Sequence, residues 1–318
     1  MTRCPGCYKA GQVGAAYCGA CRRRLFDGAK VPFTLPFSRP DYDKAKREIT
    51  SERMSISGVQ TKIPLTLRGG KLEMVDAGGR YLLKPRPQGT FARLDMVPIN
   101  EHLTMQIARQ VFKIAVAENA LVRFGDGELA YLVRRFDVQA DGERALQEDF
   151  AQIASRSEET HGKNYKYDFS YEEIGRLIQR HVATSKVDLE RFFTVVAFNY
   201  LVHNGDAHVK NFSLIRSGLT GGYNLTPAYD LLNTRLHQPD ESQAALDLFA
   251  DGFETESHRE NGFYAYDDFI EFAERLGLVG SRSKRILEAL ISKKENVFLL
   301  IDSSPLSEEC KELYKKHV

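Results

Sequence analysis

The chain has 318 residues, enough to bury a substantial core between two or three packed layers. It is 42% hydrophobic and 27% charged, as in an ordinary soluble globular protein, and its formal net charge of +1 does not indicate a nucleic-acid or membrane partner. The N-terminus lacks the apolar stretch of a secretory signal, and the longest apolar run, at 192–198, is too short to cross a bilayer. We therefore expect a cytoplasmic protein with no membrane segment.

Four of the five cysteines lie in the first 21 residues, with the spacing C-x2-C-x10-C-x2-C. In a reducing compartment this spacing predicts a tetrahedral zinc site, because each C-x2-C turn places two thiolates on one ion. The surrounding Gly- and Ala-rich segment cannot form a core of its own, so a structural metal would supply its folding energy. The alternative is disulfides or free thiols in an exported protein. The predicted ligands are Cys4, Cys7, Cys18 and Cys21.

We assign residues 1–30 to a zinc-knuckle-like segment and residues 31–54, with prolines four apart, to a linker. Three arginines at 22–24 follow the last cysteine. So short a charge run is more often a solvated face than a binding surface, so direct contact with nucleic acid is not expected.

The next part of the chain predicts a sheet with one inserted helix. Short apolar runs broken by glycines at 63–84 are typical of strands joined by tight turns. Residues 99–112 have apolar side chains at helical spacing, and a Gly-Asp-Gly turn at 125–127 joins two strands of a hairpin.

After about residue 145 the pattern becomes helical. Ser170 followed by Glu173 predicts a capping box, and residues 189–204 are apolar on nearly all sides, as in a buried helix. Residues 267–278 predict a helix with Gly277 as its C-cap, and 283–301 predict one long amphipathic helix. We expect an α+β, two-lobed, protein-kinase-like fold, with a sheet-rich N-lobe at 55–138 and a helical C-lobe at 139–318.

A polar cluster directly after the buried helix carries the first functional motif. Asp206 and Asn211 have the Asp-x4-Asn spacing of a protein-kinase catalytic loop, in which the Asp orients the substrate hydroxyl and the Asn binds a metal ion. Asp230 follows a hairpin-like segment and supplies a second metal ligand. Mg²⁺ prefers such oxygen ligands and keeps several of its waters.

A phosphate clamp is predicted in the sheet-rich part. Lys84 ends a strand, where a kinase keeps the lysine that holds the α and β phosphates of ATP, and Glu101 lies in the first turn of the inserted helix as its ion-pair partner. The loop 55–62, with Ser57 and Gly58, would cover the phosphates, although it lacks the usual G-x-G-x-x-G pattern.

Seven segments in order, "MSISGVQTK", "YLLKP", "NEH", "VRRFD", "QEDFAQI", "NGDAHVKNFSL" and "LTPAYDLL", resemble the signature segments of the HipA-family toxin kinases over roughly residues 53–300. The short chain and the Ser-Ile-Ser of the loop look most like the HipT type. This resemblance implies an ATP-dependent serine/threonine protein kinase, the toxin of a toxin–antitoxin system. Its substrate would be a protein, such as an aminoacyl-tRNA synthetase whose modification stalls translation. Its partners would be a HipB-like DNA-binding antitoxin and a separate HipS-like small subunit.

The resemblance also implies roles for individual residues. Asp206 would be catalytic, Asn211 and Asp230 would bind Mg²⁺, and Ser55 and Ser57 would be autophosphorylated, so that the loop switches ATP binding. A segment at 147–149 matches one near the family's active cleft, with a solvated helix start as the alternative. The residues expected to contact ATP are Lys84, Glu101, Ser57, Gly58, Val133, Arg134, Phe136, His208 and Lys210.

Two departures from the family pattern stand out. The family's N-terminal subdomain has no counterpart before the first matching segment, where the cysteine segment lies instead. His203 replaces a small residue, and we interpret it as packed or bracing the loop, because the kinase mechanism has no vacant role for it. Two other functions stay open: a kinase of this fold with a signalling or effector role outside a toxin system, or an inactive zinc-knuckle adaptor. We also expect that removing zinc disorders the N-terminus with little loss of ATP binding.

Overall fold

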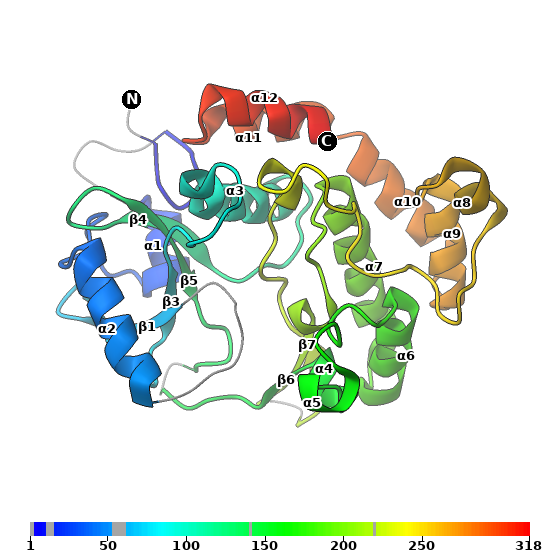
Figure 1. Cartoon of the computed structure of the whole chain (residues 1–318), viewed down its shortest axis with the longest axis horizontal. Helices are drawn as coiled ribbons and strands as arrows, with labels where there is room; N and C mark the ends of the chain where they lie inside the picture. Colours follow the sequence, from blue (N-terminus) through cyan, green and yellow to red (C-terminus); the bar gives the residue numbers. More distant parts are fainter. Residues whose placement is uncertain (1–2, 11–15, 53–61, 140–141, 219–220) are drawn as a thin grey trace.

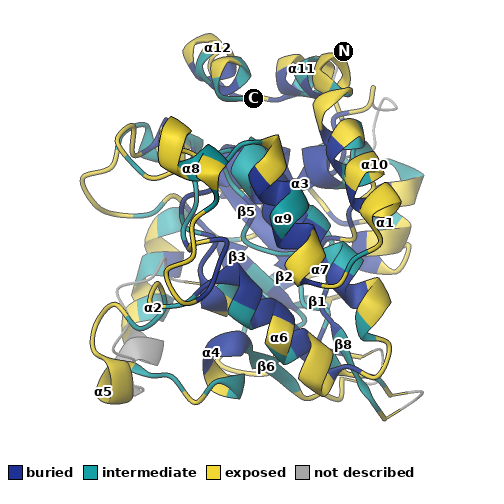
Figure 2. Cartoon of the chain, turned by 90° about the vertical axis from the view of Figure 1, so that its right-hand side faces the viewer, coloured by how far each residue is buried: buried dark blue, intermediate teal, exposed yellow. Residues whose placement is uncertain are grey.

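The computed structural model describes residues 3–10, 16–52, 62–139, 142–218 and 221–318. A sheet-rich part, with α3 beside it, and a helical part lie side by side (Figure 1). Buried residues concentrate where the elements meet in the middle of the molecule, and exposed residues lie at the periphery (Figure 2). No helix among the described residues is long and apolar enough to span a membrane.

The larger sheet is antiparallel, with the strand order β2-β1-β3-β5-β4. The close approach of β1 to the turn before β3 requires a glycine at 79, because a Cβ there would lie 2.7 Å from Pro64 Cβ and 2.8 Å from Leu65 N. The strands and turn at 63–84 and the hairpin around 125–127 are thus confirmed. The strands are β1 (Ile63–Arg68), β2 (Lys71–Met74), β3 (Tyr81–Lys84), β4 (Asn119–Arg123) and β5 (Leu129–Arg134).

The inserted helix α3 (Val97–Gln110) is confirmed, with Pro98 near its N-terminus, where a missing N–H costs nothing. It follows the 3₁₀ turn η1 (Leu94–Met96) and packs against β4 and β5. Twelve of its fourteen residues are buried, polar ones included, because the helical part and the C-terminal helices enclose its other sides.

A second sheet, of order β6-β7-β8, lies within the helical part and is antiparallel. Its strands are β6 (Gln147–Asp149), β7 (Ser213–Arg216) and β8 (Tyr223–Leu225). The pairing of Asp149 with Ser213 brings the start of α4 (Phe150–Ile153) next to the end of the predicted catalytic loop. The hairpin expected between residues 213 and 225 is therefore confirmed.

The helical part is built around α7 (Ser185–Leu201), which confirms the predicted buried helix: Phe192, Phe193 and Phe198 have no exposed surface. The Ser170–Glu173 capping box at the start of α6 is confirmed too, and Gly277 follows α9 with a φ of 70°. The helices and 3₁₀ turns are α4 (Phe150–Ile153), α5 (Glu158–His161), α6 (Tyr171–His181), η2 (Val209–Asn211), η3 (Thr234–Leu236), α8 (Glu256–Asn261), α9 (Tyr266–Arg275), α10 (Gly280–Ile291), α11 (Lys294–Ser303) and α12 (Glu308–His317).

The single long helix predicted for 283–301 is wrong, because the chain breaks at Ser292–Lys293 into α10 and α11. The apolar spacing continues across the break, so the pattern by itself does not reveal it. The two halves have different partners: α10 packs on α7 and α9, whereas α11 packs on α3 and α12. The break lets the chain cross from the helical part to α3.

Two helices precede the larger sheet. Helix α1 (Gly19–Phe26) begins at the second pair of cysteines, and α2 (Arg39–Glu52) lies within the segment that we expected to be a linker. Tyr17, Leu25 and Phe26 share a core cluster with the strands. The cysteine segment thus packs against the sheet, which supplies the core that it lacks by itself.

Candidate active site

The predicted clamp lysine and its partner meet in the structure. Lys84 ends β3, where it pairs with Tyr131 of β5, and Glu101 lies in the first half of α3. Lys84 Nζ lies 2.7 Å from Glu101 Oε1, and both side chains are almost fully enclosed. A buried ion pair of this kind fixes the lysine in one position, because breaking it would leave an unpaired charge in the core.

The second predicted metal ligand meets the same lysine. Lys84 Nζ also forms an ion pair with Asp230 Oδ1, and Asn211 Nδ2 donates to Asp230 Oδ2 at 3.4 Å. The backbone at Asp230 has a φ of 56°, which turns its side chain toward Lys84 from the segment after β8. The structure thus brings together Lys84, Glu101, Asn211 and Asp230 from four separate elements.

Burial and charge oppose each other in this group. Burial raises the pKa of Glu101 to about 7, although the Lys84 charge acts in the opposite direction. For Asp230 the charges of Lys84 and Lys62 outweigh burial, so its pKa lies below the usual value. Burial lowers the pKa of Lys84, but the carboxylates of Asp230 and Glu101 raise it by more than burial lowers it. The net pKa therefore lies above the usual value, and the lysine stays charged. The site therefore keeps a cation beside a carboxylate that is ionised at neutral pH.

The predicted catalytic loop, residues 206–211, is folded by its own side chains. Asn211 Oδ1 accepts a hydrogen bond from the His208 N–H at 3.1 Å, and the Asn211 N–H donates to His208 O at 2.9 Å. This tight η2 turn fixes Asn211 in a position from which it reaches Asp230. Asp206, just before the turn, keeps an exposed side chain, with His208 Nε2 at 3.9 Å from its Oδ1.

His208 and Lys210 differ in their surroundings. Burial lowers the pKa of His208, and its Nδ1 is enclosed without a hydrogen-bond partner among the described residues. Lys210 Nζ lies 3.3 Å from Tyr165 OH, which directs this lysine to a neighbouring loop. No described contact joins Lys210 to Lys84 or Asp230.

Two other predicted features have structural roles. Asp149 caps α4 by accepting from the Gln152 N–H at 2.9 Å, but residues 147–149 also form the half-buried strand β6 beside β7, so the segment is not simply a solvated helix start. His203 has a φ of 53°, and its carbonyl accepts from both the N–H and the hydroxyl of Thr234 at 3.0 Å. It thus braces the segment that follows Asp230.

The predicted adenine-facing residues lie at the end of β5. The N–H groups of Arg134 and Arg135 already donate to Glu118 O and Arg80 O, so neither is free for a ligand. Val133 pairs with both neighbouring strands. Phe136, just beyond the strand, places its ring centroid 5.8 Å from that of Tyr229, the residue before Asp230.

The predicted phosphate loop, with Ser55, Ser57 and Gly58, lies outside the described residues. The description resumes at the exposed Lys62, whose charge acts on both Asp230 and Glu101.

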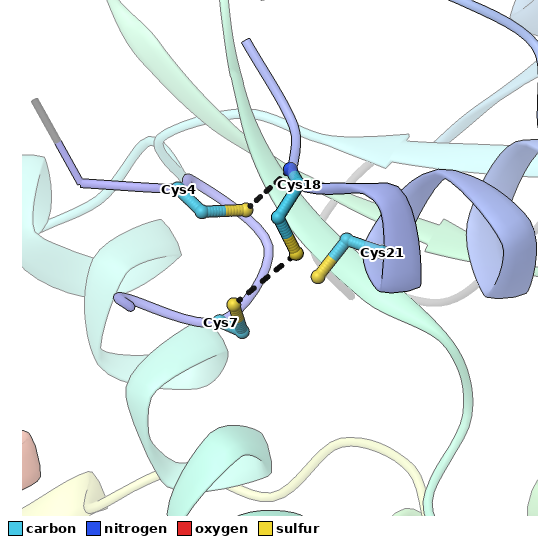
Figure 3. A group of neighbouring side chains, drawn as sticks. All are labelled: Cys4, Cys7, Cys18 and Cys21. Carbon is cyan, nitrogen blue, oxygen red and sulfur yellow. Dashed lines mark hydrogen bonds between the residues drawn. The ribbon is translucent and has the colours of Figure 1, made fainter. Parts of the chain in front are cut away.

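The four N-terminal cysteines form a compact group (Figure 3). Their sulfurs all lie within 4.8 Å of one another, none of these four described cysteines is in a disulfide, and Cys7 Sγ lies 3.8 Å from Cys18 Sγ. Zn–S bonds of about 2.3 Å in a tetrahedron place sulfurs about 3.8 Å apart. A Cβ at Gly6 would lie 3.0 Å from Cys21 Sγ, so the loop needs its glycine. The donor set and geometry fit zinc.

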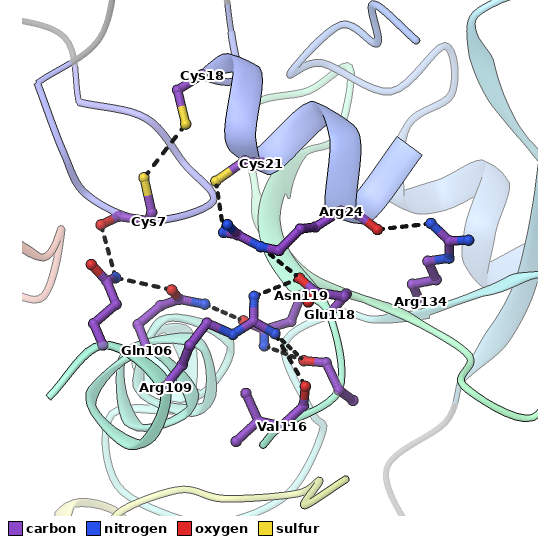
Figure 4. A network of polar contacts seen from close by, with 12 residues as sticks. Cys7, Cys18, Cys21, Arg24, Gln106, Arg109, Val116, Glu118, Asn119 and Arg134 are labelled. Atoms are coloured by element: carbon purple, nitrogen blue, oxygen red, sulfur yellow. Dashed lines mark hydrogen bonds and ion pairs between the residues drawn. The ribbon is translucent and has the colours of Figure 1, made fainter. Parts of the chain in front are cut away.

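The cysteine segment contacts α3 and β4 directly. Pro5 O accepts from the Leu121 N–H at 3.0 Å, and Cys7 O accepts from Gln110 Nε2 at 3.0 Å. Below the cysteines, Glu118 joins Arg24 of α1 to Arg109 of α3 (Figure 4). The Tyr8 ring packs edge-on against the ring of His102, with the centroids 5.0 Å apart. His102 is the residue that follows Glu101 in α3.

Sequence reasoning missed two residues that hold this site. Asn100 is fully buried; its Nδ2 donates to Asn233 O at 2.8 Å, and its Oδ1 accepts from the Asn233 N–H at 3.1 Å. The two bonds tie α3 to the segment three residues after Asp230. The sequence offered one signal for Asn100: it is the first residue of the "NEH" segment that resembles the family. Tyr167, whose hydroxyl donates to Asp206 Oδ1 at 2.6 Å, has no sequence signal that we recognise.

A small sheet with a lysine–glutamate pair, joined to a helical part with an Asp–Asn loop and a further Asp, defines a protein-kinase-like class of structure. Comparison with known proteins gives the family. Residues 54–298 match the family described as HipA-like C-terminal domain. The chain therefore belongs to the HipA-like family.

Its relatives are named as kinases. A protein of Haemophilus influenzae, whose name marks it as an inferred kinase, is 30% identical over 83% of this chain and 79% of its own length. The serine/threonine-protein kinase toxin HipA of Shewanella oneidensis is 28% identical over 71% of this chain and 52% of its own.

Two solved structures share the fold. HipA of Shewanella oneidensis, in a complex with HipB and operator DNA, superposes with a TM-score of 0.63 and 25% identity over 83% of this chain and 63% of that chain. The Helicobacter pylori proinflammatory kinase CtkA superposes with a TM-score of 0.53 and 15% identity, covering 80% of this chain and 87% of that chain. The α+β, kinase-like fold is thereby confirmed.

Proposed function

We propose that the chain is an ATP-dependent serine/threonine protein kinase. The observation that carries the proposal is the convergence of Lys84, Glu101 and Asp230, with Asn211 bonded to Asp230. Four side chains from separate elements meet in the arrangement that phosphoryl transfer needs, a fixed cation for the phosphates beside oxygen ligands for metal. Kinase-named relatives support this proposal, although the chain spans only about half of the HipA relative.

The residues divide the work as follows. Lys84, held by Glu101, binds the α and β phosphates, and Asn211 with Asp230 holds Mg²⁺, which neutralises charge on the transferred phosphate. Asp206 accepts a hydrogen bond from the acceptor hydroxyl and takes its proton as the new O–P bond forms and the bond to ADP breaks. His208 lies behind Asp206, and Phe136 with the carbonyl groups at the end of β5 receives the adenine.

Two finer proposals concern the segments around this site. The loop with Ser55 and Ser57 carries the autophosphorylated serines, because phosphate there adds nearly two negative charges where ATP must place its own. Cys4, Cys7, Cys18 and Cys21 hold one structural zinc ion, as their sulfur geometry supports. On this proposal residues 55–138 are the N-lobe and 139–318 the C-lobe.

The biological role we propose is that of a HipT-like toxin acting on a translation component such as an aminoacyl-tRNA synthetase. A HipB-like antitoxin is a matching partner, because the Shewanella oneidensis relative is named in a complex with HipB. A HipS-like subunit follows from the resemblance to the HipT type alone. A signalling role for the same kinase is the alternative, whereas an inactive adaptor is disfavoured by the assembled Lys84–Asp230 site.

The test is phosphate transfer from labelled ATP in a cell lysate, with the labelled protein then identified. We expect transfer by the wild type, and a loss of at least a hundredfold in Asp206→Asn and Asp230→Asn, because positioning and charge stabilisation supply most of the catalysis. Both variants must stay folded, as shown by a cooperative melting transition above the assay temperature. Transfer by Asp230→Asn at the wild-type rate would show that the metal assignment is wrong.

A further inference from the structure

The acceptor side of the site holds a hydroxyl group of the chain itself. Tyr167 lies in the loop between α5 and α6, and its hydroxyl donates to Asp206 Oδ1 at 2.6 Å. A serine or threonine acceptor must make the same kind of bond, an O–H donor to this carboxylate, before its oxygen can attack phosphorus. Tyr167 therefore presents to the proposed base the group that a substrate would present.

The loop is tied to the catalytic segment on either side of this contact. The Val209 N–H donates to Lys166 O at 3.3 Å, and Lys210 Nζ reaches Tyr165 OH at the same distance. The Tyr167 ring lies edge-on to His208, with centroids 5.4 Å apart, and Lys166 Nζ lies 4.8 Å from the ring centroid. These contacts hold the phenol against the Asp206 carboxylate.

The tyrosine is nevertheless less enclosed than the buried groups of the site. Its residue surface is 39% exposed, and it belongs to neither core cluster of the described residues. Asn100, which fixes the opposite side of the site, is by contrast fully enclosed and bonded twice to one backbone unit. A residue that must hold a geometry is normally buried in this way, whereas an exposed phenol can rotate into water at little cost.

We propose that Tyr167 is a gate on the acceptor site: its hydroxyl occupies the place of the acceptor hydroxyl on Asp206, and the acceptor must displace it before transfer. Tyr167 thereby controls the rate of phosphate transfer to different acceptors. A small, weakly bound acceptor such as water competes poorly with the tethered phenol for the Asp206 carboxylate. This inference rests on the kinase function proposed above and names the residue that controls access to its base.

The test measures steady-state ATP hydrolysis with Mg²⁺, in which water is the acceptor, so that no protein substrate is needed. Tyr167→Phe removes the hydroxyl and keeps the ring. We expect its kcat to rise roughly threefold to tenfold, the range for a half-exposed hydrogen bond to a charged group, with the KM for ATP unchanged. The matched control is Tyr266→Phe, an equally exposed tyrosine on α9, which should behave as wild type.

A second measurement reports the contact without turnover. In protein labelled with ¹³C at the tyrosine Cζ, the signal that is lost in Tyr167→Phe belongs to Tyr167. Burial and the Asp206 carboxylate both raise the pKa of Tyr167, so Asp206→Asn should lower the pH at which this signal titrates. A titration that is the same in wild type and Asp206→Asn would show that the hydroxyl does not lie on Asp206 and would overturn the gate.

The kinetic outcomes separate the two proposals. If neither the wild type nor Tyr167→Phe hydrolyses ATP faster than Asp206→Asn, the gate is wrong, and the kinase function is judged by phosphate transfer to protein in the lysate. If the wild type turns over but Tyr167→Phe is unchanged or slower, the function stands and the gate is wrong. A slower variant with the same KM for ATP would mean that Tyr167 orients Asp206 rather than blocking it.

Discussion

At the scale of single residues, the site depends on polar groups that are buried with their partners. Lys84 balances two carboxylates, and Asn100 satisfies both backbone groups of Asn233. Such groups are stable only when every partner is present, since an orphaned donor or acceptor in the interior keeps its full desolvation cost. The position of Asp230 is thus set partly by an amide in α3, a helix more than a hundred residues earlier in the sequence.

Substituting that amide tests the coupling. Asn100→Ala should lower the free energy of unfolding by about 1–3 kcal/mol, because the buried Asn233 N–H is left without a partner and the Asn233 carbonyl keeps only the long hydrogen bond from the Leu236 N–H at 3.4 Å. It should also lower kcat for ATP turnover, since the segment that carries Asp230 loses its tie to α3. Chemical denaturation and steady-state kinetics measure the two effects.

The matched control is Asn261→Ala on the exposed helix α8, for which we expect a change within about 0.5 kcal/mol and unaltered kinetics. Wild-type stability and kinetics in Asn100→Ala would show that the two hydrogen bonds do not hold the segment.

At the scale of elements, the cysteine segment is part of the support for the sheet and α3. Cys4, Cys7 and Cys21 are buried in the same cluster as residues of β1, β3 and β5. Tyr8 enters the main cluster beside α3. The structure therefore argues against the expectation that metal loss leaves ATP binding largely intact, because Cys7 and Tyr8 contact α3, the helix that carries Glu101.

Metal removal tests this support. Freshly purified, reduced protein should hold about one zinc per chain, and a chelator should lower both the melting temperature and the affinity for a non-hydrolysable ATP analogue, since binding energy of the metal is folding energy for its surroundings. Cys7→Ser should do the same.

Cys310→Ser, at a buried cysteine in α12 outside the group, is the control and should keep its zinc. Protein without zinc at full stability would contradict the metal site, and zinc loss without a change in ATP affinity would restore the original expectation.

At the scale of the whole molecule, one core runs through both parts. The main cluster joins α3 and β5 with residues of α7, α9, α10 and α12. The C-terminal helices lie across α3 (Figure 1), where the fully buried Tyr314 of α12 contacts Thr104 Oγ1 at 2.8 Å. Because α3 shares its core with the helical part, we expect the two parts to unfold together.

Tyr314→Ala should therefore destabilise the entire fold. Removing a fully buried ring costs about 3–5 kcal/mol, and the loss should lower the temperature of a single calorimetric transition rather than split off a C-terminal one. Tyr266→Ala, at an exposed position on α9, should shift that temperature by no more than a degree or two. Two separate transitions in the wild type would mean that the parts fold independently.

The local structure and the residues available for chemistry could be predicted from the sequence. The strands of the sheet, the α3 and α7 helices and the Ser170 cap follow from period, burial pattern and capping, which act over a few residues. The pairing of Lys84 with Glu101 and of Asn211 with Asp230 could be predicted as well. Their motifs all serve phosphoryl transfer, and that reaction requires these residues to lie in one site. The grouping of the four cysteines followed from the reach of two C-x2-C turns.

Features that depend on partners far away in the sequence could not be predicted, because they arise from three-dimensional packing. The break between α10 and α11 is set by where each half packs, although its apolar pattern is continuous. The hydrogen bonds between Asn100 and Asn233 join residues that are 133 positions apart, and the hydrogen bond from Tyr167 to Asp206 joins residues that are 39 positions apart. No local pattern encodes such contacts, because an Asn or a Tyr has the same propensities whether or not a partner arrives. Their roles exist only once the chain has closed around the site.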